Sequence, residues 1–249
     1  ISGDEGNVRN LIINEIKDCA DDIKTDNLGN LIVFKKGKKS AKSKLMVSAH
    51  MDEVGLMVTD ITSDGYLKFD EVGGIDRRVL PGKRVCVGRN SLNGVIGVKP
   101  IHLTNGDEKT AVPKMNDMYI DIGAESREDA LKYVNYGDGI NFEGDFKING
   151  KTVVTKALDD RFGCYVLINL IKSEPEYDMY FTFVVQEEVG LRGARPAAFT
   201  VNPDFALVIE STTAADVAEV DASHQVCNLS KGATVTVMDL SLIHISEPT

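Results

Sequence analysis

The chain of 249 residues contains no tryptophan, and aromatic residues make up only 6% of it. Its four cysteines are far apart and form no Cys-x-x-Cys pair, so they indicate neither a zinc ribbon nor a redox motif. No apolar run approaches the roughly 18 to 20 residues that cross a bilayer, and the N-terminus is polar instead of resembling a signal peptide. We therefore expect a cytoplasmic protein that does not bind a membrane.

Positive charge is also scarce in this sequence. Lys and Arg total 28 against 38 Asp and Glu, which gives a formal net charge of -10. Such a surface repels a phosphate backbone, so we expect no nucleic-acid partner. The hydrophobic share of 43% and the charged share of 27% are those of a globular protein with a real core.

The chain alternates between two patterns of residues. Residues 1–64 and 151–249 carry helical periodicity and apolar runs, which are typical of an α/β domain. Between them, residues 65–150 consist of short β-branched runs separated by Gly, Asn and Asp at intervals of about eight to twelve residues. We predict an α/β domain, residues 1–64 and 151–249, interrupted by an inserted small all-β domain, residues 65–150.

Local patterns predict individual elements within the α/β segments. Apolar residues recur at steps of three and four from Val8 to Ile23, which predicts a helix over residues 7–23, and a second helix is predicted through residues 164–171. Strands are predicted for the apolar runs 31–34, 45–48, 153–154, 180–185 and 205–209.

Four of these runs end beside side chains that can bind metal ions. In chain order they are His50 and Asp52, then Asp159, then Glu187 and Glu188, and finally Glu210. Because ligand sites in open α/β sheets lie at the carboxyl ends of the strands, these side chains can converge. One imidazole with several carboxylates suits Zn²⁺, Co²⁺ or Mn²⁺, and two such ions bridged by a carboxylate generate hydroxide in hydrolytic sites.

Two of these motifs also have plain alternative interpretations. His50-Met51-Asp52 places an imidazole and a carboxylate on one side of an extended segment, where Asp52 can orient His50. The same pair is also common as a polar strand end. Asp159-Asp160-Arg161 equally predicts a helix N-cap with a neighbouring salt bridge.

The acidic residues of the later runs carry unequal information. Glu187 and Glu188 are adjacent carboxylates at a sheet edge, and they repel each other unless a cation or proton lies between them. Glu210 alone says little. We interpret His102 and His224 as structural or solvated.

Taken together, these stretches resemble the M42 family of metallo-aminopeptidases, the group of glutamyl and tetrahedral aminopeptidases. The resemblance runs from the start of the chain to about Asp239. It is carried by SAHMDEVG (48–55), KALDDR (156–161), VQEEVGLRGA (185–194) and IESTTAAD (209–216), and by VGGID (72–76) and VLPG (79–82) in the β-rich segment.

The resemblance implies a zinc-peptidase-like catalytic domain with a mixed sheet, a β-barrel-like insert and two divalent metal ions, Zn²⁺ or Co²⁺ with Mn²⁺ as a further candidate. His50 and Glu210 would bind one ion, Asp159 would bridge both, and Glu188 would bind the second. Many relatives have Asp where this chain has Glu210.

The resemblance also implies a reaction and partners. Removal of the N-terminal residue from short peptides would use a metal-bridging water, with Glu187 as general base and Asp52 orienting His50. Acidic, basic and apolar N-terminal residues all remain open as substrates. Relatives assemble into large hollow homo-oligomers, and the same is implied here for the full-length protein.

The end of the sequence departs from the family. Relatives continue beyond this length and supply a final histidine ligand, whereas residues 240–249 look foreign to the family and contain His244. We therefore expect one near-normal metal site, one weak site, little peptidase activity and some exposed apolar surface. The alternatives are a metal-binding but catalytically deficient fragment and an endoglucanase-type hydrolase.

Overall fold

The structure is a computed structural model that describes residues 1–106, 111–225 and 227–235. Its central element is a mixed five-stranded sheet with the order β1-β2-β12-β3-β13. The strands are β1 (Asp22–Thr25), β2 (Leu31–Lys35), β3 (Leu45–His50), β12 (Met179–Val184) and β13 (Phe205–Val208). The strands β12, β3 and β13 run parallel to one another, whereas β1 and β2 form an antiparallel pair at one edge. The expected mixed α/β fold is therefore present.

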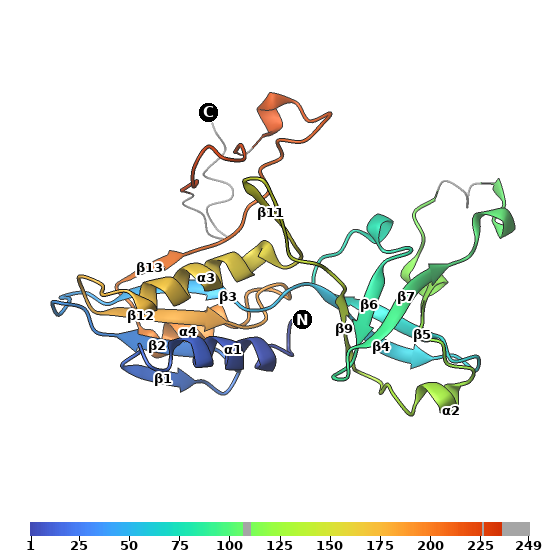
Figure 1. Cartoon of the computed structure of the whole chain (residues 1–249), viewed down its shortest axis with the longest axis horizontal. Helices are drawn as coiled ribbons and strands as arrows, with labels where there is room; N and C mark the ends of the chain where they lie inside the picture. The colour runs from blue at the N-terminus through green and yellow to red at the C-terminus, as the bar shows by residue number, and fades with distance from the viewer. Residues whose placement is uncertain (107–110, 226, 236–249) are drawn as a thin grey trace. The chain divides into compact units, whose positions relative to one another are not determined.

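Helices cover both faces of this sheet (Figure 1). They are α1 (Gly6–Ile16), α3 (Leu158–Lys172) and α4 (Ala194–Val201). Because side chains alternate along a strand, Phe181 and Phe183 of β12 point to one face, where they join Ile16 of α1 in the main core. On the other face, Met46 of β3 packs in a smaller cluster with Val201 of α4.

The first helix is shorter than the sequence pattern predicts. It ends at Ile16, and Ile23 belongs instead to β1, where it is paired with Val33. Both Cys19 and Ile23 still pack against the main core, from a turn and from a strand. The apolar periodicity therefore continues past the helix end, so the prediction of a helix to residue 23 is wrong there.

The run 153–154 was predicted to be a strand of the α/β sheet, and this prediction is wrong. The run lies in β11 (Thr152–Val154), which pairs with β10 (Lys147–Asn149) in a two-stranded antiparallel sheet. Gly150, in the connecting turn, has a φ of +61°, a left-handed conformation that glycine adopts readily. A short β-branched run beside such a turn forms a local hairpin as readily as a buried strand.

After β3, the chain forms a closed barrel. Its six strands, in the order β4-β5-β8-β7-β6-β9, enclose a separate apolar core that includes Leu56, Leu67 and Ile96. The strands are β4 (Gly55–Ile61), β5 (Leu67–Val72), β6 (Arg84–Val87), β7 (Leu92–Val98), β8 (Met118–Asp121) and β9 (Gly139–Phe142), with the short helix α2 (Arg127–Ala130) before β9. The first and last strands pair with each other, so the chain enters and leaves the barrel at neighbouring strands.

Two compact units divide the chain, Ile1–Ser211 and Thr212–Thr249. The described part of the second unit contains a 3₁₀ helix, Ala222–His224, and a hydrogen bond of 2.7 Å from the Leu229 amide to Asp216. Further 3₁₀ turns lie in the first unit at Arg77–Val79, Ile101–Leu103 and Met115–Asp117. Within the described ranges, no helix is long and apolar enough to cross a bilayer.

The central strand β12 and the edge strand β13 predict a large difference between two phenylalanines. Phe181 is 0% exposed beneath α1 and α3, whereas Phe205 on the edge strand β13 is 66% exposed. We expect Phe181→Ala to lower the free energy of unfolding by about 3–5 kcal/mol, because it leaves a cavity in the main core. Phe205→Ala, the matched control, should cost less than about 1 kcal/mol. Urea denaturation followed by circular dichroism measures both, and equal losses would contradict this account of the core.

Candidate metal and catalytic site

Predicted site residues meet at the carboxyl ends of three parallel strands. In the register of the sheet, His50 of β3 lies opposite Val184 of β12, and Ser48 lies opposite Val208 of β13. Glu187 and Glu188 follow β12, and Glu210 follows β13, so each reaches the same edge as His50 within a few residues. This is the edge at which α/β sheets place their ligand sites.

His50 is the centre of the cluster. It is the last residue of β3 and only 1% exposed. Its Nδ1 atom lies 3.1 Å from the backbone oxygen of Asp52, and its Nε2 atom lies 3.0 Å from Asp159 Oδ1 and 3.5 Å from Glu210 Oε1. Although burial lowers the pKa of His50, hydrogen bonds to Asp52 and Glu210 raise it to about 11. The ring is therefore held on one side and faces carboxylates on the other.

Asp52 is fully buried and acts on the other site residues through hydrogen bonds. Its carboxylate accepts from the backbone amides of Glu187 at 3.0 Å and Glu188 at 3.1 Å and from the Ser2 hydroxyl at 2.5 Å. Burial raises the pKa of Asp52, but hydrogen bonds from His50, Ser2 and these two amides overcome this effect and hold it at about 2. A charged carboxylate with this many hydrogen-bond donors around it fixes the positions of the groups that donate to it.

Asp159 and Asp160 lie at the start of α3, where their backbone angles are not helical. Asp159 points toward Nε2 of His50, and burial together with Glu210 raises its pKa. Asp160 is 0% exposed, and its carboxylate accepts hydrogen bonds from the amides of His50 and Gly163. The N-cap interpretation therefore describes Asp160, and Asp159 is the residue that faces the imidazole.

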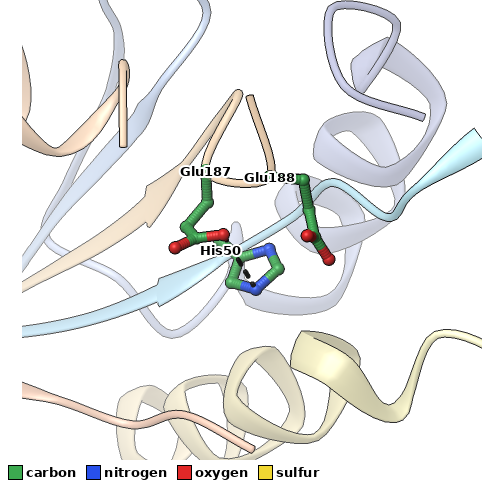
Figure 2. A group of neighbouring side chains, drawn as sticks. All are labelled: His50, Glu187 and Glu188. Carbon is green, nitrogen blue, oxygen red and sulfur yellow. Dashed lines mark ion pairs between the residues drawn. The ribbon is translucent and has the colours of Figure 1, made fainter. Parts of the chain in front are cut away.

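Glu187 and Glu188 lie on either side of the His50 ring (Figure 2). Glu187 Oε2 is 4.0 Å from His50 Nε2, and one ligand atom from each of the three residues lies within 4.8 Å of the others. Burial raises the pKa of both glutamates, and the nearby charge of Asp159 adds to the shift at Glu188. A cation between these two adjacent carboxylates would relieve their mutual repulsion.

Glu210 completes the cluster from the end of β13. Its Oε1 atom accepts a hydrogen bond of 3.0 Å from the Ser211 amide, which fixes its direction. Burial raises its pKa, but the hydrogen bond and charge of His50 outweigh this, so the pKa is lowered. His50, Asp160 and Glu210 form a second group whose ligand atoms lie within 4.8 Å of one another.

The donor chemistry of the site fits divalent metal ions. Both groups of closely spaced donors share His50, and every other donor in them is a carboxylate oxygen. One imidazole nitrogen with oxygen donors suits Zn²⁺, Co²⁺ and Mn²⁺. The described histidines outside the cluster, His102 and His224, are exposed and belong to neither group, and His244 lies outside the described residues.

Several residues that support the site were not among the site residues predicted from the sequence. Glu53, 8% exposed, is bound by Lys156 at 2.8 Å and lies 3.6 Å from Arg161, whose Nε atom donates to the backbone oxygen of Met51. Glu53 and Arg161 lie in the stretches that resemble the family, close in sequence to predicted site residues, and this position was the available clue to their role. Ser2 had no such clue, because its partner Asp52 is 50 positions away.

Known proteins resemble this chain in sequence and in fold. The chain matches the M42 glutamyl aminopeptidase family over residues 29–248. A curated relative from Acetivibrio thermocellus is 46% identical, over 98% of this chain and 71% of that protein. A TET aminopeptidase structure from a marine sediment thaumarchaeote superposes with a TM-score of 0.87 at 36% identity, covering 93% of this chain and 67% of that one.

A second solved structure bears on assembly. The TET1 peptidase of Pyrococcus horikoshii, which its title says can assemble into a tetrahedron or a large octahedral shell, is 44% identical with a TM-score of 0.77. The match covers 89% of this chain and 68% of that one, so this chain spans about two-thirds of the length of each of these three proteins. The family match extends over most of the chain, and the chain belongs to the M42 family of aminopeptidases.

Proposed function

We propose that this site removes N-terminal residues from short peptides and that it does so with two divalent metal ions, Zn²⁺ or Co²⁺, with Mn²⁺ as a third candidate. His50 and Glu210 would hold one ion, Asp159 would bridge, and Glu188 would hold the other. The observation that carries the proposal is the approach of Asp159 and Glu210 to the same nitrogen of His50, at 3.0 and 3.5 Å. Membership of an aminopeptidase family supports the same activity.

Bound metal ions would supply Lewis acidity for water activation and carbonyl polarisation. The protein's own groups then perform the proton transfers. Glu187 is part-buried, and burial raises its pKa above its ordinary value, the direction of shift that improves a general base. It would accept a proton from the attacking water and deliver it to the leaving amine, while Asp52 keeps His50 oriented.

The organisation of the whole protein is part of the proposal. We propose that the barrel is a domain inserted into the α/β domain and that it mediates assembly into a homo-oligomer, as the assembly of the TET1 peptidase suggests. Its strands begin at Gly55 and end at Phe142, so the insert proposed here starts before residue 65 and ends before residue 150. The cytoplasm is the proposed location.

Metal removal tests the function. We expect aminoacyl p-nitroanilides to be hydrolysed by the metal-loaded chain, with hydrolysis lost on chelation and restored by Co²⁺ or Zn²⁺. Glutamyl, lysyl and leucyl derivatives compare acidic, basic and apolar preferences. Activity on a glucan that survives chelation would favour an endoglucanase, which uses two carboxylates and no metal and leaves the buried His50 without a role. Metal binding without any hydrolysis would identify a catalytically deficient fragment.

A further inference from the structure

Buried side chains outside the loop that carries Glu187 and Glu188 support it, in addition to backbone hydrogen bonds within the loop. Three consecutive amides of this loop donate to buried carboxylates. Gln186 donates to Glu5 at 3.1 Å, and Glu187 and Glu188 donate to the two oxygens of Asp52 at 3.0 and 3.1 Å. The direction of both glutamate side chains therefore depends on where Asp52 and Glu5 are fixed.

This loop needs such support because its first residue has an unusual backbone conformation. Gln186 has a φ of +54°, in the left-handed region that residues with a side chain seldom occupy. A conformation of this kind persists only where the surroundings over-determine it. The backbone oxygen of Gln186 accepts from the Arg192 amide at 3.0 Å, and the hydrogen bonds to Glu5 and Asp52 hold the amide side of this turn.

The N-terminal segment anchors the two carboxylates. Ser2 is 6% exposed, and its hydroxyl donates to Asp52 Oδ2 at 2.5 Å, on the same oxygen that accepts from the Glu188 amide. The backbone amide of Ser2 donates to the backbone oxygen of Glu53 at 3.3 Å. Glu5, 5% exposed, accepts from the Gly3 amide at 2.7 Å as well as from Gln186. Asp52 thus receives donors from Ser2, from two loop amides and from the side of the His50 ring.

We propose that Ser2 is a positioning residue of this site. Its hydroxyl occupies one of the acceptor directions of Asp52 and fixes the rotation of that carboxylate. The same carboxylate then aligns three groups at once, which are the amides of Glu187 and Glu188 and the Nδ1 side of His50. The consequence for turnover rests on the proposed function, whereas the consequence for the loop does not.

Amide exchange in the metal-free chain tests the role of Ser2 without relying on catalysis. Ser2→Ala removes only the hydroxyl, and we expect exchange at the Glu187 and Glu188 amides to accelerate about tenfold or more. Ser2→Thr restores a hydroxyl and should keep these rates within about twofold of the original chain. Ser173→Ala removes an exposed hydroxyl that donates to Leu170 and is the matched control, with no change expected. NMR resolves the individual amides.

Two results would overturn the proposal. Unchanged exchange in Ser2→Ala would show that the hydroxyl does not hold the loop. Equal acceleration in Ser2→Ala and Ser2→Thr would show that packing at this position matters and the hydrogen bond does not. A circular dichroism melt of each variant establishes that the fold is intact before the rates are compared.

Kinetics of the metal-loaded chain provide the second measurement. Because Ser2 acts through Asp52 on the groups that perform the reaction, Ser2→Ala should lower kcat about tenfold and leave KM within about twofold. A rise in KM with an unchanged kcat would contradict the positioning role. If the original chain hydrolyses no peptide, the proposed function fails, while the exchange rates still decide what Ser2 does.

Discussion

Glu187→Gln should reduce turnover by about 10²- to 10⁴-fold, the usual contribution of a general base, while the bound metal stays constant. The amide side chain keeps the shape of the glutamate but cannot accept a proton. The backbone amide that donates to Asp52 is untouched, so the loop should keep its position. Turnover of a p-nitroanilide at saturating metal, together with metal content by mass spectrometry, measures the effect.

Glu188→Gln is the matched control, because it makes the same chemical change one residue further along the same loop. It should lower metal content as well as turnover, since Glu188 is the proposed ligand. The geometry makes the comparison decisive, because both glutamates have ligand atoms within 4.8 Å of His50. Equal loss of metal in the two variants would reassign Glu187 as a ligand.

Metal titration of the 249-residue chain is expected to resolve one tight site and one weak site. The first ion would have His50, Asp159 and Glu210, and the distances of 3.0 and 3.5 Å around His50 Nε2 show how closely these donors approach one another. From the residues that the structure describes, the second would have Asp159 and Glu188, fewer than the three protein ligands usual for catalytic zinc. Among the described residues, no second histidine joins either cluster of donors. Peptidase turnover should therefore be low until high metal concentrations fill the weak site.

Calorimetry with Zn²⁺ and with Co²⁺ measures both affinities. Asp159→Asn should weaken both sites, because this carboxylate is the proposed bridge, whereas Glu210→Gln should weaken only the tight one. Two tight sites with robust turnover in the original chain would contradict the assignment. A single site insensitive to Asp159→Asn would contradict the bridging role.

Local sequence patterns predicted much of the site because its chemistry follows local rules. His50, Glu187 and Glu210 each lie at or just after the end of an apolar run, and these three runs form the parallel strands β3, β12 and β13. A buried strand needs apolar side chains along its length, and its end is where polar groups can emerge. The residue types at this edge of the sheet, and the edge itself, could therefore be predicted without a structure.

The sequence patterns gave wrong predictions where the same apolar residues are compatible with two kinds of secondary structure. Residue Ile23 continues the helical periodicity although it lies in β1, and the run 153–154 forms a hairpin outside the main sheet. Asp159 consequently reaches His50 from the start of α3 and not from a strand end. Only packing against the rest of the chain selects between these alternatives.

The composition class, the resemblance to a family and the residue types that can hold metal ions all follow from the order of the amino acids. Which atoms meet depends on the folded chain: it sets which nitrogen of His50 faces Asp159 and Glu210, and which aspartate caps α3. It alone brought Ser2 to Asp52 across 50 positions. The physical reason is that hydrogen bonds and charge interactions act over a few ångströms, and separation along the chain places no limit on which groups folding brings that close.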